Sequence, residues 1–338
     1  MKRFREEILA FVFVFAVLLT TGTWAQAAQD KKDVKYPTKP IDLIVPYAPG
    51  AGIDGSARLV AAYASKKFGV PVNVVNVTGA SGVIGMVQAL RSAPDGYTML
   101  MEGSSTSSFM FAARADLAMK LEDRTYVART MGDYWYFFVN NDTGWKSLPE
   151  VIQFIKTKPT EFRWGAGAFA AIPMYAELDL FLAAGVGMET IKKTRMVVFE
   201  KGNAPSVQAV ITGDVQFAGG STAEVDSVLS TKRVRVLGVN APARVKAYPD
   251  VPTAKEQGYP KADIVYWHGV SGPKGLPGYV VKAWDDLLGK AMTDPDAQTM
   301  AVKAQKNWQY LPSDQFKASV LNEYQKSLNV AIGLGFRK

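Results

Sequence analysis

The stretch Ile41-Asp42-Leu43-Ile44-Val45-Pro46-Tyr47-Ala48-Pro49-Gly50-Ala51-Gly52-Ile53-Asp54 decides the fold. Its first five residues are an apolar run typical of a buried strand, and a loop rich in proline and glycine follows. Apolar residues between Ala57 and Ala64 then recur at helical spacing. The same order of strand, glycine loop and helix returns at Val70–Val77, Gly79–Gly85 and the residues up to Leu90. This repeat predicts a parallel sheet.

Both glycine loops follow the carboxyl ends of strands, where open α/β sheets bind ligands. Glycine allows a backbone to approach a ligand closely, and the free N–H groups at a helix start attract anions. We therefore expect half of an anion-binding cleft in this region. A third loop is predicted at Glu102–Ser108, after a short strand at Thr98–Met101. Its hydroxyl residues either contact a ligand or cap a helix.

The whole chain fits an α/β protein of about two domains, because it has 338 residues of which 48% are hydrophobic. It has no cysteine and one histidine, His268, which excludes disulfides, thiolate sites and metal sites built from several histidines. We interpret His268 as a packed histidine, and we expect no catalytic residue, cofactor or metal. The net charge of +8 is scattered, which argues against nucleic-acid binding and suits an anionic ligand or simple solubility.

Residues 1–27 are predicted to be a cleaved export signal. Lys2, Arg3 and Arg5 form a basic start, Ile8–Leu19 is an apolar core, and Ala25-Gln26-Ala27 matches a small-x-small cleavage site. An uncleaved membrane anchor is the alternative, and the polar residues that directly follow argue against it. We expect a mature chain in the periplasm that begins near Ala28.

Seven short motifs in order resemble a known family. They are Tyr36-Pro37-Thr38-Lys39-Pro40, Pro49–Asp54, Gly79–Gly85, Pro94-Asp95-Gly96-Tyr97-Thr98, Lys201-Gly202, Gly213-Asp214-Val215 and Pro249-Asp250-Val251-Pro252-Thr253. Together they are similar to the periplasmic solute-binding proteins of the tripartite tricarboxylate transporter family, the TctC-like or Bug receptors. The resemblance extends from about residue 36 to the carboxyl terminus.

The resemblance implies a periplasmic-binding-protein-like α/β fold with two lobes, each with a central sheet flanked by helices, joined by a hinge. Lobe 1 would comprise residues 34–137 and 246–338, and lobe 2 residues 138–245. A small organic carboxylate would bind between the lobes and pass to the membrane permease subunits of the transporter; we expect the receptor to be a monomer. The ligand-binding residues predicted from the loops are Tyr47, Ala51, Gly52, Ile53, Asp54, Ala80, Ser81, Gly82, Ser104, Ser105, Gly167, Ala168, Phe169, Gly220 and Ser221.

Two features depart from the family pattern and bear on the ligand. The segment Gly167-Ala168-Phe169 is apolar, and Gly219-Gly220-Ser221 has no carboxylate where an aspartate is common. Hydroxyls on one side and apolar surface on the other suit an acid with an aromatic or aliphatic body. We therefore expect benzoate-like acids and other apolar mono- and dicarboxylates to bind better than citrate or glutamate, unless Phe169 packs into lobe 2.

Two alternatives stay open at this point. Gly50-Ala51-Gly52-Ile53-Asp54-Gly55 fits the G-x-G-x-x-G pattern of nucleotide-dependent oxidoreductases. The second strand ends at Asn76, however, where that fold places an acidic residue for the ribose. A receptor that reports its ligand to a membrane sensor kinase cannot be separated from a transport receptor by sequence. Asp54 itself is either a ligand contact or a helix cap.

Overall fold

The computed structural model describes residues 35–167, 171–199, 203–304 and 306–337. The fold described below is that of the compact unit formed by residues 39–338. The predicted export signal therefore lies outside the described residues, as do Ala168, Phe169 and the Lys201-Gly202 motif. Within the described ranges, none of the helices is both long and apolar enough to cross a bilayer.

The first sheet has six strands in the order β11-β4-β10-β3-β1-β2. β1, β2 and β3 are parallel to one another, whereas β10 runs antiparallel to β3 and β4. The amino end of β10 therefore lies beside the carboxyl end of β3. The strands are β1 (Ile41–Val45), β2 (Val72–Asn76), β3 (Thr98–Gly103), β4 (Arg124–Asp133), β10 (Tyr266–Pro273) and β11 (Trp308–Pro312).

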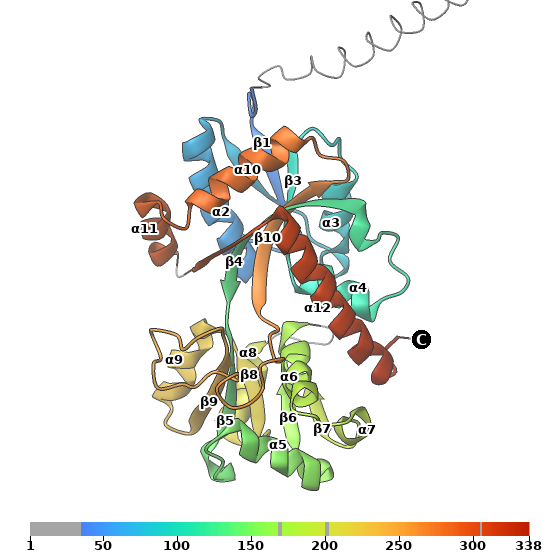
Figure 1. Cartoon of the computed structure of the whole chain (residues 1–338), viewed down its shortest axis with the longest axis vertical. Helices are drawn as coiled ribbons and strands as arrows, with labels where there is room; N and C mark the ends of the chain where they lie inside the picture. The colour runs from blue at the N-terminus through green and yellow to red at the C-terminus, as the bar shows by residue number, and fades with distance from the viewer. Residues whose placement is uncertain (1–34, 168–170, 200–202, 305, 338) are drawn as a thin grey trace, which may run out of the picture. The chain divides into compact units, whose positions relative to one another are not determined.

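Helices cover both faces of the first sheet (Figure 1). On one face, Phe68 of α2 (Gly52–Phe68) makes an edge-on contact with Trp284 of α10 (Gly278–Lys290). On the other, α3 (Val83–Leu90) and α12 (Ser313–Gly333) share a hydrophobic cluster that includes Leu90 and Phe316. The remaining elements of this part are η1 (Ala80–Gly82), η2 (Ser105–Phe109), α4 (Met110–Ala113), η3 (Leu121–Asp123) and α11 (Pro295–Lys303).

The second sheet has five strands in the order β7-β6-β8-β5-β9. β5 (Trp135–Asn140), which lies between β8 and β9, is buried on both faces, because alternate side chains enter two different clusters. The other strands are β6 (Arg163–Ala166), β7 (Arg195–Val198), β8 (Phe217–Gly220) and β9 (Val234–Asn240). Around them lie η4 (Asn141–Thr143), α5 (Leu148–Thr157), η5 (Pro159–Glu161), α6 (Ile172–Ala183), α7 (Met188–Ile191), α8 (Asn203–Thr212) and α9 (Thr222–Ser230).

The chain passes between the sheets twice, at Tyr134 and over residues 241–265. Ala254, Ala262 and Ile264 pack in the cluster of the second sheet, beyond the expected lobe boundary at residue 245. The carboxyl end of α12 also reaches this cluster through Val330. We therefore propose that lobe 2 includes the connection up to about residue 264, and that α12 joins both lobes.

These two sheets with flanking helices confirm the predicted fold class. The three strands predicted around the glycine loops agree with β1, β2 and β3 to within about two residues. The third loop was predicted wrongly, because Glu102 and Gly103 belong to β3 and Ser105–Phe109 forms a π-helical turn. A charged residue such as Glu102 signals a loop in sequence, yet here it is fully buried in an ion pair with Arg124 of β4. The sequence pattern also missed β4, β11 and α11.

Candidate functional site

A pocket of about 210 Å³ lies at the strand ends of the first sheet. We call it the first-sheet pocket. Among its lining residues are five that the sequence predicted as ligand contacts: Tyr47, Ala51, Gly52, Ile53 and Ser105. Four further lining residues were not predicted as contacts: Gly103, Thr106, Tyr266 and His268.

The amino end of α2 forms one wall of this pocket. α2 begins at Gly52 after Ala51, whose side chain cannot cap the helix. The backbone N–H groups of Gly52 and Ile53 have no hydrogen-bond acceptor within the described part of the chain. Because the first N–H groups of a helix carry partial positive charge, this wall favours an anionic or strongly polar oxygen.

Asp54 holds the loop before α2 in place. One carboxylate oxygen accepts from the Gly50 N–H and from the Arg58 Nε, both at 2.9 Å, and the other accepts from Asn76 Nδ2 at 3.0 Å. Burial opposes ionisation, but these hydrogen bonds and the Arg58 charge outweigh it and lower the pKa of Asp54. Asp54 is thus neither the N-cap residue nor part of the pocket lining. Contact between Asp54 and a ligand stays a prediction.

The second glycine loop is held in a strained conformation. Ala80 and Ser81 have φ angles of 47° and 55°, in the left-handed region that residues with a Cβ rarely adopt. Both side chains are exposed. A Cβ at Gly85 would lie 2.4 Å from the Val77 carbonyl oxygen and 2.9 Å from Pro46 Cα, so glycine is required for this loop to pack on the first. Ala80, Ser81 and Gly82 do not line the pocket.

The π-helical turn η2 presents Ser105 and Thr106 to the pocket and is anchored from behind. The Ser107 hydroxyl donates to Glu102, which also pairs with Arg124. The Ser108 hydroxyl donates to Glu323 of α12. Ser104, which was predicted as a contact, is fully buried and lies outside the pocket lining.

Tyr266 and His268 form the opposite wall, at the start of β10. The His268 Nε2 lies 2.9 Å from the Tyr266 hydroxyl, and its Nδ1 lies 2.8 Å from the Ser56 Oγ of α2. Burial, together with the nearby positive charge of Lys306, lowers the pKa of His268 to about 3, so the imidazole is neutral. Tyr266 and His268 are two residues apart in a strand, so both side chains lie on the same face of the sheet. This spacing is the feature of the sequence that could have predicted that they act together.

Of the residues predicted from the second sheet, the three that are described, Gly167, Gly220 and Ser221, lie outside the first-sheet pocket. Gly167 is packed against Asn203, and a Cβ there would come within 2.4 Å of the Asn203 Cα. A Cβ at Gly220 would come within 2.5 Å of the Phe138 ring. The backbone N–H and hydroxyl of Ser221 both donate to the Glu224 carboxylate, at 2.6 and 3.0 Å. Their contact with a ligand stays a prediction.

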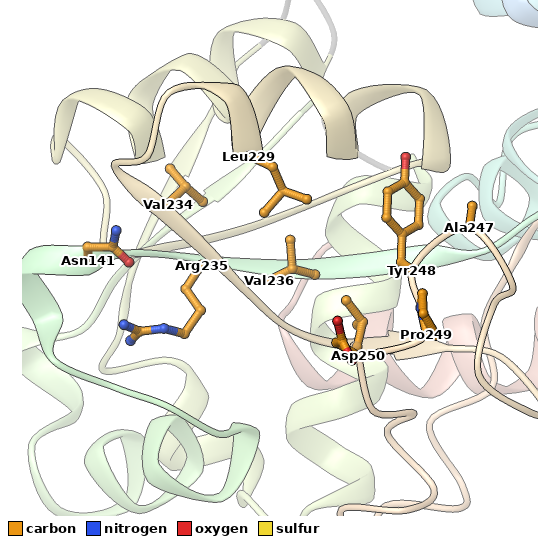
Figure 2. Close-up of a pocket in the computed structure, with 10 residues that line it drawn as sticks. Asn141, Leu229, Val234, Arg235, Val236, Ala247, Tyr248, Pro249 and Asp250 are labelled. Carbon is orange, nitrogen blue, oxygen red and sulfur yellow. The ribbon is translucent and has the colours of Figure 1, made fainter.

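A larger pocket of about 460 Å³ lies on the outer side of the second sheet and contains no predicted contact residue. Figure 2 shows Asn141 and Arg235 at one end of it and Tyr248 at the other. Two of its polar side chains are already paired: Arg235 donates to the Trp145 carbonyl, and the Tyr248 hydroxyl donates to Asp226 at 2.9 Å. In the described ranges, no group of three or more histidine or acidic side chains could hold a metal ion.

Comparisons with known proteins agree with this architecture. A model of the tripartite tricarboxylate transporter family receptor matches residues 56–333. The chain is 28% identical over 335 residues to a protein encoded in the gbd 5′ region of Cupriavidus necator, with 99% of both chains covered. A solved TctC solute-binding protein from Polaromonas has a TM-score of 0.74 at 25% identity and covers 87% of this chain and 98% of its own.

Two further solved structures share the fold at lower identity. MatC from Rhodopseudomonas palustris, solved with malate, has a TM-score of 0.65 at 23% identity and covers 88% of this chain and 100% of its own. Rpa4515 from R. palustris, solved with adipate, has a TM-score of 0.69 at 22% identity and covers 89% and 98%. The family match spans most of the chain and the fold agrees with it, so this protein belongs to the tripartite tricarboxylate transporter family receptors.

Proposed function

We propose that this protein captures a small organic dicarboxylate in the first-sheet pocket. The observation that carries the proposal is the wall formed by the start of α2, where the N–H groups of Gly52 and Ile53 lack an acceptor in the described residues and border the cavity. These N–H groups and the hydroxyl of Ser105 can surround one carboxylate without any cationic side chain. Malate and adipate, found in two proteins of the same fold, belong to this class.

The ligand is expected to carry little charge beyond its acid groups. Within the described residues, no arginine or lysine lines the first-sheet pocket, so a tricarboxylate would leave at least one charge unpaired. The pocket of about 210 Å³ is also small, below the range of about 300–1,000 Å³ typical of drug-sized ligands. We propose that short apolar diacids and benzoate-like acids bind better than citrate or glutamate.

Calorimetric titration tests the ligand class directly. Adipate, malate, terephthalate, citrate and glutamate are titrated into the mature protein, and a thermal-shift series is run with the same acids. A ligand at 100 times its dissociation constant should stabilise the folded state by about 2.7 kcal/mol. Tighter binding of citrate or glutamate than of adipate and terephthalate would show that the ligand class is wrong.

We also propose that the receptor works in the periplasm and delivers its ligand to permease subunits in the membrane. The basic start, apolar core and small-x-small site within residues 1–27 support export. Mass spectrometry of the periplasmic fraction should find an amino terminus at or near Ala28. Uptake of labelled ligand should fall when the gene is deleted; unchanged uptake would argue against delivery.

A further inference from the structure

The first-sheet pocket is connected to α2 by a chain of neutral polar groups. Tyr266 and His268 both line the pocket; one ring nitrogen of His268 is bonded to the Tyr266 hydroxyl, and the other is bonded to the Ser56 hydroxyl of α2. Ser56 also lies 3.4 Å from the Gly52 carbonyl oxygen, which is long for a hydroxyl hydrogen bond. His268 is 3% exposed and Ser56 is fully buried, so solvent does not compete for the bond between them.

Each group in this chain has one proton to place, and only two arrangements satisfy both ring nitrogens. In the first, the Ser56 hydroxyl donates to Nδ1, Nε2–H donates to the Tyr266 oxygen, and the Tyr266 hydroxyl is free to donate into the pocket. In the second, every bond is reversed: Tyr266 donates to Nε2, Nδ1–H donates to Ser56, and Ser56 donates to the Gly52 carbonyl. The two differ in which nitrogen of a neutral imidazole carries the proton.

The surroundings keep the three groups neutral. Burial and the Lys306 charge hold the imidazole unprotonated, and burial raises the pKa of the Tyr266 hydroxyl well above its usual value. The two arrangements are therefore tautomers of one neutral system, and no net charge enters the pocket. A carboxylate offers only acceptor atoms, so it can bond to Tyr266 in the first arrangement alone.

We propose that Ser56, His268 and Tyr266 form a relay that turns a hydrogen-bond donor toward the ligand, and that a bound carboxylate fixes His268 as its Nε2–H tautomer. This inference rests on the proposed function, since it needs a carboxylate in the first-sheet pocket. It assigns Tyr266 a ligand contact, and it makes His268 and Ser56 positioning residues.

The packing around the relay fixes its geometry. The rings of Tyr266 and His268 meet edge-on at 4.6 Å. A Cβ at Gly103 of β3 would lie 2.9 Å from His268 Cδ2. The imidazole therefore packs against a position of β3 where a side chain would collide with it. A flip of the ring would break both of its hydrogen bonds, so the proton position is the variable that can respond to a ligand.

The test uses ¹⁵N NMR of protein labelled at histidine, which is unambiguous because the chain has one histidine. In protein saturated with adipate or malate, the Nε2 signal should be that of a protonated nitrogen and the Nδ1 signal that of an unprotonated one. A bound state with the proton on Nδ1, or on both nitrogens, would overturn the relay. Absence of binding by both acids would overturn the proposed function and the relay together.

The adipate affinities of three variants provide a second test of the relay. Tyr266→Phe should weaken adipate binding about tenfold, because one hydrogen bond to a charged acceptor is lost. Tyr248→Phe is the matched control. It loses a tyrosine hydrogen bond to Asp226 at the larger pocket of the second sheet, and it should bind adipate normally. Ser56→Ala should weaken binding less than Tyr266→Phe. Equal affinity of Tyr266→Phe and the wild type, with both folded by circular dichroism, would contradict the ligand contact.

Discussion

At the strand ends of the first sheet, Gly82 and Gly85 let separate loops close on one another, and a pocket remains beside them. At the strand end of the second sheet, Gly219 and Gly220 admit the rings of Trp135 and Phe138 from the neighbouring strand. A glycine at a strand end can therefore have one of two roles: it lets two backbones approach closely, or it leaves space for a large side chain. Composition alone does not separate them.

The two regions also differ in how polar groups are paired. The α2 start leaves N–H groups without acceptors in the described residues, whereas Ser221 at the start of α9 gives both of its donors to Glu224. Asn203 donates to the same carboxylate at 2.9 Å. The first region has donors that an added acceptor could use, whereas the donors of Ser221 and Asn203 are bonded to Glu224 within the protein.

The largest expected effect comes from Gly85→Ala. The new Cβ would collide with backbone atoms of Val77 and Pro46, which cannot move without opening both glycine loops. We expect a loss of about 3 kcal/mol in the free energy of unfolding, measured by urea denaturation, and loss of diacid binding. Gly278→Ala is the control, because nothing lies within 4 Å of its Cβ position and its stability should be unchanged or higher. Wild-type stability of Gly85→Ala would refute the packing argument.

A somewhat smaller effect is expected from Gly219→Ala in the second sheet. Its Cβ would lie 2.0 Å from Trp135 Nε1, and the indole is buried at 2% exposure. Overpacking of this kind costs about 1–3 kcal/mol of stability. Because the first-sheet pocket is untouched, the folded variant should keep its affinity for diacids in calorimetry. Loss of binding without loss of stability would mean that the second sheet contributes directly to recognition.

The buried carboxyl of Glu323 should make stability depend on pH. It accepts from Trp267 Nε1 at 3.0 and 3.1 Å and from Ser108 behind the pocket. Burial is the largest influence and raises its pKa from 4.5 to about 8, so the folded protein retains a proton that the unfolded chain has released. Its contribution is complete below about pH 4.5 and is lost as the pH rises to about 8.

Urea denaturation across this pH window measures the effect. The wild type should lose stability relative to Glu323→Gln as the pH rises, by at most about 1.4 kcal/mol per pH unit. Glu161→Gln, whose side chain is 62% exposed, is the control and should follow the wild type. A constant difference between wild type and Glu323→Gln would mean that Glu323 does not titrate in this window.

Gly52→Ala should have the smallest effect on stability. The added Cβ would lie 3.4 Å from the Tyr266 hydroxyl, an ordinary contact, so unfolding should change by less than about 1 kcal/mol. Diacid affinity should nevertheless fall, because the methyl group occupies part of the first-sheet pocket. Calorimetry beside urea denaturation separates the two. An affinity equal to that of the wild type would show that the ligand does not approach Gly52.

The sequence by itself determined the fold class and the first wall of the site. Strand, loop and helix recur with clear periodicity around Ile41–Val45, and local rules for parallel sheets then place Tyr47 and Ala51–Ile53 at a strand end. Four of the predicted contacts line the pocket for this reason. Such inferences need only residues that are close in the chain.

Only the tertiary structure decided what faces that wall. Ser56 and His268 are 212 residues apart, and no local pattern predicts that their side chains meet at 2.8 Å. The end of β3 was missed for a similar reason. A charged residue such as Glu102 indicates a loop in the sequence, and only the structure shows that its charge is neutralised by Arg124. Long-range pairing decides which polar groups are already satisfied, and therefore which ones remain for a ligand.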